Sequence, residues 1–421
     1  KVELMKKLLC CTALCAVFVS PEVLASGFNL KEQSAAAQGN AFAGATAGAE
    51  DITYSYFNPA GLTRHTGTKM AVGGTWIAPR SKAKTASSDN LVAGHTETGY
   101  TGNIVHAAVS PNFYISHQID NKWTAAFSLN TPFGMITTYD DDWAGRFHGT
   151  KSDVKTLTAT PMIAYRPFCK LSLGAGFQMQ YVRAKLSNAQ ITMNGIRPQE
   201  DHTKLYGDAL DIGYTLGAMY EYSDNTRFGI GYRSQIKHKL KGNIDFSKAV
   251  DMDQNISARL TTPANLTFGA YHDINDQWSV MAEFGRTYWS SFKELRILGQ
   301  NGIDSITQEK WKDTTFYAVG ASYRYNDKWK FRAGFAVDQG AVGEYYRTPR
   351  IPDADRLWYS GGIEYSLDDR TTLNLGYTYI RAEKGRVNLD GHHEGDALRG
   401  SMKAKYENDI HILAVGLNYN F

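Results

Sequence analysis

From residue 68 to the C-terminus, apolar residues alternate with small or polar ones in a period of two. In 371–380, for example, Leu373, Leu375 and Tyr377 are separated by single Asn and Gly residues. Successive side chains of a β-strand point to opposite faces, so this pattern predicts strands with one apolar face. In a membrane barrel that face contacts lipid. A soluble sheet with one buried and one wet face would give the same pattern.

Short and long connections alternate along this region. Tight polar turns are expected at 119–123, 166–170, 223–227, 274–278, 325–329 and 367–371. Longer polar stretches are expected at 80–103, 140–152, 188–208, 245–257, 299–311, 344–355 and 385–404. The count predicts about fourteen antiparallel strands. Short turns on one rim and long loops on the other are typical of bacterial outer-membrane barrels.

Two further features favour a membrane barrel. Trp123, Trp278 and Trp329 each lie at the end of a tight turn, where an aromatic girdle would meet the lipid interface. The last strand alternates up to Phe421, and this ending resembles the signal that the outer-membrane barrel assembly machinery recognises. We therefore expect an all-β, multi-pass barrel over 68–421 in a Gram-negative outer membrane. Both termini should lie on the periplasmic side, and the assembly machinery should be a partner.

The N-terminal segment has the composition of a secretory signal peptide. A positive start at Met5–Lys7 precedes an apolar core at 8–19 and a small-residue cleavage site that ends at Ala25. We expect residues 1–25 to be removed, and 1–4 to be extra residues ahead of the start. Three of the four cysteines leave with this segment, so the mature chain keeps Cys169 and forms no intramolecular disulfide.

Residues 26–67 do not follow the alternating pattern. They are rich in Ala and Gly and predict short helices and turns. A fourteen-strand barrel has a lumen too wide for wall side chains to fill, and large barrels are often plugged. We therefore expect 26–67 to form a small, partly helical hatch inside the lumen. A separate periplasmic domain or an unstructured leader are the alternatives.

Composition excludes several function classes. Lys and Arg total 45 against 42 Asp and Glu, without a basic stripe along the chain, so a nucleic-acid partner is not expected. The common nucleotide, zinc-protease and serine-hydrolase motifs are absent from the sequence, so we expect no enzyme and no cofactor. The loops His392–Glu394 and Asp140–Asp142 contain metal-ligand residue types. Solvated loops explain both better than a metal site does.

One strand carries a fault in its middle. The third strand should run from Trp123 to about Tyr139, but it contains Thr131, Pro132, Phe133 and Gly134. Pro removes a backbone donor, and Gly weakens a strand interior. A strand that stopped there would be too short for the ~9–11 residues that a crossing needs. Because lipid tolerates unpaired backbone only where protein or a cavity covers it, the sequence predicts an opening in the wall with the hatch behind it.

Several motifs carry a family resemblance. The stretches "SGFNL" (26–30) and "GNAFAGATAGAEDITYSYFNPAGL" (39–62), with Asn58, Pro59 and Ala60, resemble the hatch of the FadL-type outer-membrane long-chain fatty-acid transporters. Further similar stretches are "NTPFG" followed by "WAGRF", "TTPANLTFG" (261–269), 345–365 and the closing strand. They span nearly the whole mature chain in the family's order. The family also includes uptake channels for aromatic hydrocarbons.

The resemblance implies an importer of hydrophobic small molecules, most simply long-chain fatty acids. Substrate would be caught among extracellular loops and would move to a pocket near the hatch, close to the mature N-terminus at Ser26, Gly27 and Phe28. Phe28 and Phe57 are candidates for the lining of an apolar pocket, with simple packing of the hatch as the alternative. A rearrangement of the hatch would then release it sideways through the kink at 131–134. It also implies a monomer, surrounded by outer-membrane lipid and lipopolysaccharide.

An apolar route suits such a substrate, because each CH₂ kept out of water gains about 0.8 kcal/mol. Arg183 and Lys185 are candidate contacts for a carboxylate, with a solvated strand end as the alternative. The competing functions are an aromatic hydrocarbon channel, a general diffusion porin, and a surface adhesin or lipid-active enzyme.

Overall fold

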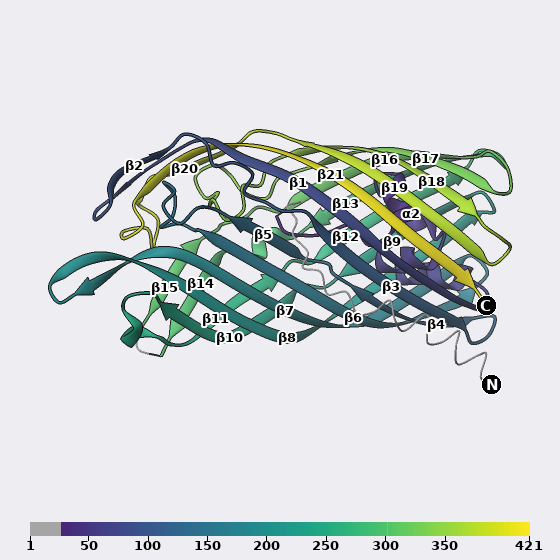
Figure 1. The fold of residues 1–421 in the computed structure, drawn as a ribbon. Helices are drawn as coiled ribbons and strands as arrows, with labels where there is room; N and C mark the ends of the chain where they lie inside the picture. Colours follow the sequence, from purple (N-terminus) through teal and green to yellow (C-terminus); the bar gives the residue numbers. More distant parts are fainter. Residues whose placement is uncertain (1–26, 301) are drawn as a thin grey trace, which may run out of the picture.

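The first long strand of the chain pairs with the last one and closes the sheet (Figure 1). This computed structural model describes residues 27–300 and 302–421, so the expected signal peptide and Ser26 lie outside the described residues. The predicted fourteen-strand antiparallel barrel is confirmed. Seven of its crossings consist of two shorter strands each, which gives 21 named strands in all.

The first crossings are β1 (Thr68–Asn90), β2 (Gly94–Thr98) with β3 (Ala108–Gln118), β4 (Trp123–Asn130) with β5 (Gly134–Thr138), β6 (Lys151–Phe168), β7 (Leu171–Asn194) and β8 (Arg197–Ser223). The next are β9 (Thr226–Arg233) with β10 (Ile236–Phe246), β11 (Gln254–Thr262) with β12 (Asn265–Asp273), and β13 (Trp278–Thr287) with β14 (Glu294–Gly299). The last are β15 (Asp304–Gln308) with β16 (Thr314–Arg324), β17 (Trp329–Asp338), β18 (Arg356–Ser366), β19 (Thr371–Ala382) with β20 (Gly385–Leu389), and β21 (Ser401–Asn420). Two single 3₁₀ turns, η4 (Val250–Met252) and η5 (Trp289–Ser291), lie between strands.

The tight turns share one local chemistry. In four of them an Asp or Asn side chain accepts hydrogen bonds from the backbone N–H groups two and three residues later; these acceptors are Asp120, Asn275, Asn326 and Asp368. A short polar side chain thereby replaces a backbone acceptor and tightens the turn. A tryptophan follows each of three of these turns and packs on a tyrosine of the neighbouring strand, in the pairs Trp123–Tyr165, Trp278–Tyr323 and Trp329–Tyr365. These pairs mark one rim of the apolar belt.

The long connections are more ordered than the sequence suggested. The predicted polar connection 188–208 is mostly strand, since β7 runs to Asn194 and β8 begins at Arg197. Likewise β1 continues to Asn90, inside the predicted connection 80–103. The prediction of long loops at these two places was wrong because both faces of a strand are polar once it leaves the lipid. The alternating pattern then disappears although the hydrogen-bonded ladder continues.

The segment before β1 lies inside the barrel, shown in purple in Figure 1. It contains α2 (Ala35–Gly39), α3 (Ala45–Gly48) and the 3₁₀ turns η2 (Ile52–Tyr56) and η3 (Pro59–Arg64). α2 contacts β18, β19 and β21, α3 contacts β9, β12 and β13, and η3 contacts β6, β7 and β8. These strands lie on different sides of the wall, so the segment fills the lumen. Among the described helices none is long and apolar enough to span a membrane.

Buried charges and wall glycines hold this segment in place. Glu50 lies 2.8 Å from the Lys330 ammonium and 2.6 Å from the Arg332 guanidinium, which is almost fully buried. Asn58 caps η3 by accepting a hydrogen bond from the Ala60 N–H, and its amide donates to the Ala218 carbonyl of β8. A Cβ at Gly217 would lie only 2.0 Å from the Asn58 Oδ1. The wall therefore needs a residue without a side chain at this contact.

We predict that Gly217→Ala lowers the stability of the barrel. The added methyl group would displace Asn58 and leave buried polar groups unpaired, at about 1–3 kcal/mol. The matched control is Gly361→Ala, where the nearest atom to a new Cβ is 3.9 Å away. Heat-induced unfolding in detergent measures both variants. Equal midpoints for the two variants would contradict this account of the contact.

Candidate functional site

The wall is interrupted where the sequence predicted a fault. β4 ends at Asn130 and β5 begins at Gly134. The ladder between β3 and β4 ends at the pair Phe113–Leu129. In the described part of the chain, β5 pairs along its length with β6 alone, so its other edge has lost its neighbouring strand. On the facing strand β3, Pro111 lies at the same height in the wall as the fault, and it has no backbone N–H to donate.

The N-terminal segment takes the place of the missing neighbour. Asn29 and Phe133 form an antiparallel bridge. The Leu30 N–H donates to the Pro132 carbonyl at 2.8 Å, and the Gly134 N–H donates to the Phe28 carbonyl at 3.0 Å. The Gln33 amide also donates to the Thr131 carbonyl at 3.0 Å, so three backbone groups of 131–134 are satisfied from inside the barrel. The backbone of Phe133 bonds instead to Thr156 of β6. The inner end of the opening is thus covered by the first described residues of the chain.

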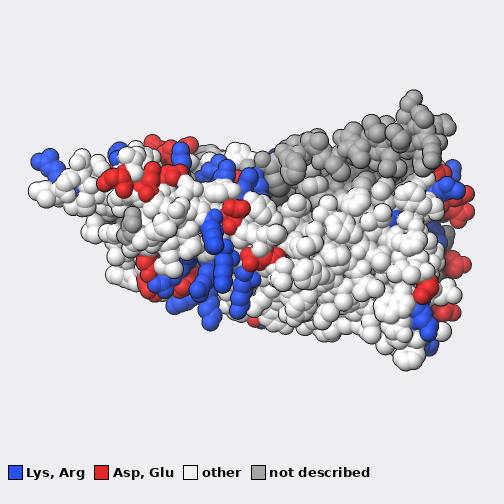
Figure 2. Space-filling model, turned by 90° about the horizontal axis from the view of Figure 1, so that it is seen from below, with Lys and Arg blue, Asp and Glu red and all other residues white. Residues whose placement is uncertain are grey.

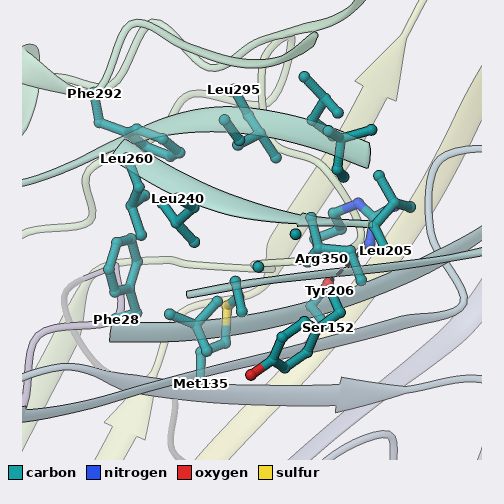
Figure 3. A pocket seen from close by; sticks show the side chains of 18 of the residues that line it. Phe28, Met135, Ser152, Leu205, Tyr206, Leu240, Leu260, Phe292, Leu295 and Arg350 are labelled. Carbon is teal, nitrogen blue, oxygen red and sulfur yellow. Dashed lines mark hydrogen bonds between the residues drawn. The ribbon is translucent and has the colours of Figure 1, made fainter. Parts of the chain in front are cut away.

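An apolar cavity adjoins this bridge. Its side chains surround about 750 Å³ of empty space, which includes open solvent, and about 70 Å³ of it admits the centre of a water-sized sphere. Its lining comes mostly from aliphatic side chains, among them Val154, Leu205, Leu240, Leu260, Leu295 and Ile297. Figure 3 shows Phe28 and Met135 at one side of the cavity and Arg350 near Leu205 at the other. Such a shape, apolar with few polar groups, suits a small hydrophobic ligand.

Phe28 belongs to an aromatic cluster that closes one end of the cavity. Its ring centroid lies 5.0 Å from that of Trp289, 6.0 Å from Trp311, 5.8 Å from Phe133 and 6.2 Å from Phe292. The preceding residue, Gly27, has φ +63°, and a Cβ there would lie 2.3 Å from the Trp311 ring. The start of the hatch is therefore fixed both by its backbone bonds and by ring packing.

Behind this cluster lies a second, more polar cavity of about 620 Å³. Phe57 lines it, together with Lys31, Arg233 and Glu283. The Phe57 ring packs on Phe42 and Tyr56 rather than on the first cavity. Phe28 and Phe57 thus face two different spaces, although the sequence analysis placed both at one pocket.

The polar end of the first cavity is cationic. Arg350 comes from the connection between β17 and β18 and donates hydrogen bonds to the Lys151 carbonyl, the Ser152 hydroxyl and the Asn188 side-chain oxygen. Within residues 27–300 and 302–421, it forms no ion pair with a carboxylate. Burial and the neighbouring Arg399 lower the pKa of Arg350 to about 10. The cavity therefore presents a half-buried cation whose hydrogen-bond partners are all neutral.

One carboxyl group also lines this cavity. Glu309 accepts a hydrogen bond from the Trp311 indole N–H at 2.9 Å. Burial raises the pKa of Glu309 to about 7, against the attraction of Arg350 and Arg399. Near neutral pH the group therefore exists in both its neutral and its ionised form.

The structure corrects the expected position of two cations. On β7, Val182, Ala184 and Leu186 point inward, and the last two line the cavity. Arg183 and Lys185 alternate with them and so lie on the outer face of the wall. They do not reach a ligand in the lumen. The cation that does is Arg350, which the sequence analysis missed because it lies in a loop that only the fold brings over β6 and β7.

Metal-ligand residue types also occur in the loops His392–Glu394 and Asp140–Asp142 and at Cys169. In the described part of the chain, no group of three or more His, Cys, Asp or Glu residues could hold a metal ion. His393 instead stacks on Tyr346, with 4.6 Å between ring centroids. Asp140–Asp142 are exposed, and Cys169 is a free, exposed thiol.

Comparisons with known proteins agree on one family. Residues 16–421 match the family model described as outer membrane protein transport protein (OMPP1/FadL/TodX). The chain is 27% identical to the long-chain fatty acid transport protein of Escherichia coli O6:H1 (strain CFT073), over 97% of each chain. It is 26% identical to outer membrane protein P1 of Haemophilus influenzae Rd, over 94% of this chain and 95% of that one.

Solved structures show the same fold. A FadL homologue of Pseudomonas aeruginosa superposes with a TM-score of 0.87 at 23% identity, over 94% of this chain and 100% of that one. The toluene transporter TbuX of Ralstonia pickettii superposes with a TM-score of 0.66 at 19% identity, over 88% and 94%.

Proposed function

Because the chain belongs to the OMPP1/FadL/TodX family of outer-membrane transporters of hydrophobic compounds, we propose that it imports long-chain fatty acids. The family is one of transport channels and not of enzymes. The proposal narrows the substrate from hydrophobic compounds in general to amphiphiles with an acyl chain and an anionic head.

The observation that carries this proposal is Arg350 at the end of the apolar cavity. Arg350 is half-buried and, in the described part of the chain, has no carboxylate within ion-pair distance, so an anionic ligand would supply the missing charge partner. A carboxylate also matches the planar donor geometry of Arg. The acyl chain would extend along the aliphatic lining toward Phe28 and gain about 0.8 kcal/mol per buried CH₂. A hydrocarbon fills the same space but leaves Arg350 without an anion.

The proposed route leaves the barrel sideways. The hatch fills the lumen below the cavity, which argues against a straight aqueous path and against a general diffusion porin. Displacement of Phe28 would break the bridge at Asn29–Phe133 and uncover the fault at Thr131–Gly134. The substrate would then pass through the wall without crossing bulk water. In this proposal 26–67 act as the hatch, and Asn58, Pro59 and Ala60 hold its far end against the wall.

An aromatic hydrocarbon is the second candidate substrate. The rings of Phe28, Trp289, Phe292 and Trp311 around the cavity end favour it, since aromatic rings pack well on one another. The two candidates differ in their need for Arg350.

The remaining partners are also proposals. We propose a monomer in the outer membrane, with Phe421 as the contact for the barrel assembly machinery and both termini in the periplasm. The C-terminus lies at the rim of the tight turns, which supports this orientation (Figure 1).

We predict that Arg350→Gln weakens binding of a long-chain fatty acid by about 10–100-fold, the equivalent of one charge-assisted hydrogen bond at about 1.5–3 kcal/mol. Toluene binding should not change. Calorimetry on the purified barrel measures both ligands, and Arg350→Lys, which keeps the charge, is the matched control. An unchanged affinity for the fatty acid in Arg350→Gln would overturn the proposed substrate class.

We predict that anion binding weakens as the pH rises through about 7. Below that pH Glu309 is neutral, and above it the ionised group attracts Arg350 and repels a bound anion. Arg399 and the Trp311 indole also face Glu309. Around pH 7 the Arg399 guanidinium stays ionised and the indole stays neutral, so neither changes its charge in this range. A long-chain alkyl sulfonate is the suitable probe because its head group stays ionised. Glu309→Gln should bind the probe equally well below and above neutral pH. If this variant lost as much affinity with rising pH as the unmodified protein does, Glu309 would not be the group responsible.

We predict that a disulfide between Asn29→Cys and Phe133→Cys blocks uptake. Asn29 and Phe133 lie directly opposite each other, and the residues on either side of them make the hydrogen bonds. At such a non-hydrogen-bonded position of an antiparallel pair, Cα atoms lie about 4.5 Å apart and can be bridged by a disulfide. The background should be Cys169→Ser, which removes the free thiol. Uptake of radiolabelled fatty acid should stop under oxidation and return with a reductant. Unchanged uptake in the fully cross-linked protein would exclude this opening step; each single-cysteine variant serves as a control.

A further inference from the structure

A patch of cations without ion-pair partners lies on the outer face of the barrel. It consists of Arg183, Lys185, Lys204, Lys237, Lys239, Lys241 and Arg259, from β7, β8, β10 and β11. Figure 2 shows Lys and Arg gathered midway along this side of the molecule, directly beside a wide surface without charges. In the described part of the chain none of the seven lies within ion-pair distance of an acid. We call this surface the cationic patch.

The alternation of β10 fixes the direction of these side chains. Ile236, His238 and Leu240 are buried, whereas Lys237 and Lys239 are exposed. The latter two therefore point away from the lumen, toward whatever surrounds the barrel.

The patch lies at the far edge of the apolar belt. Along one crossing, the 11 residues from Thr226, at the start of β9, to Ile236, directly before Lys237, match the ~9–11 residues that span the hydrocarbon core. On β8, Leu210 and Ile212 are the next outward residues below Asp208, and they are 68% and 63% exposed. The cations therefore start where the belt ends, on the rim opposite the tryptophans. That is the depth of lipid head groups.

The register places like charges directly opposite one another. Lys239 pairs with Arg259 across β10 and β11, and Arg259 pairs with Arg296 across β11 and β14. Of these three, Arg296 alone has an acidic partner, Asp304. Like charges at directly opposed positions destabilise a sheet. At the pair Lys239–Arg259, an anion from outside the chain would offset this repulsion.

We propose that the cationic patch binds the phosphate groups of the outer-leaflet glycolipid, lipopolysaccharide. Phosphates carry the opposite charge and suit both Arg and Lys donors. Asp208 lies directly opposite Arg183 and Lys241, and Asp245 lies directly opposite Lys204; two acids among seven cations leave the patch with an excess of positive charge. The inference concerns the outer wall and does not depend on which ligand the inner cavity takes.

The test uses the purified full-length barrel in a neutral detergent. The variant Lys237→Ser, Lys239→Ser, Arg259→Ser removes three cations of the patch. The matched control, Lys122→Ser, Lys328→Ser, Arg370→Ser, removes three exposed cations at the rim of the tight turns. Native mass spectrometry measures binding of lipid A that carries both phosphates, of dephosphorylated lipid A and of inorganic phosphate.

We expect the unmodified protein and the control to bind phosphorylated lipid A at least about tenfold more tightly than the patch variant does. Dephosphorylated lipid A and inorganic phosphate should bind weakly to all three proteins. Heat-induced unfolding without lipid gives a second readout. Because like charges repel, the patch variant should unfold at a higher temperature than the unmodified protein, and it alone should gain no stability from lipid A.

Equal binding of phosphorylated lipid A by the patch variant and the unmodified protein would overturn the proposal. So would an equal loss in the control. Tight binding of dephosphorylated lipid A would attribute the contact to acyl chains, and tight binding of inorganic phosphate would indicate a free-anion site; both results would also contradict it.

Discussion

The structure depends on the backbone of Thr131–Gly134, which must find hydrogen-bond partners although its neighbouring strand is missing. In lipid an unpaired peptide group costs several kcal/mol, so a barrel wall can be interrupted only where other protein covers the gap. Here the cover is the start of the hatch, through the Leu30 N–H and the Phe28 carbonyl. The same residues that complete the wall therefore also close the apolar cavity. In the proposed route, this shared segment is the part that moves.

The rest of the molecule keeps this segment in position while leaving it separable. Two sets of contacts hold the hatch at points far from the fault. They are the ion pairs of Glu50 with Lys330 and Arg332, and the contact of Asn58 with the glycine-lined wall. At the fault itself the contacts are the short bridge, the packing of Phe28 against other rings, and a hydrogen bond from the Gln33 amide to the Thr131 carbonyl. Displacement of the first residues of the hatch breaks few contacts, whereas loss of the whole hatch would leave buried charges unpaired. A local opening is thus much less costly than release of the plug.

Much of the fold was predictable because local chemistry determines it. An Asp or Asn followed by a Trp, as at Asp120–Trp123 and Asn326–Trp329, marks a tight turn in both sequence and structure. Pro132 and Gly134 predicted the interrupted strand for the same reason. The extended hairpin beyond Asn188 was missed, because alternation vanishes in water although pairing continues. The site was less predictable, since Arg350 reaches the cavity only through the tertiary fold. Likewise, Arg259 lies opposite Lys239 and Arg296 only through the register of the sheet.

The central claim is that one cavity holds an acyl chain with its carboxylate at Arg350 and its far end at the Phe28 cluster. The most direct measurement is an experimental structure of the barrel with a bound long-chain fatty acid. The account predicts a carboxylate within hydrogen-bond distance of the Arg350 guanidinium and continuous density along Leu240 and Leu260 toward Phe28. A fatty acid bound elsewhere, or bound here with its carboxylate directed away from Arg350, would contradict it.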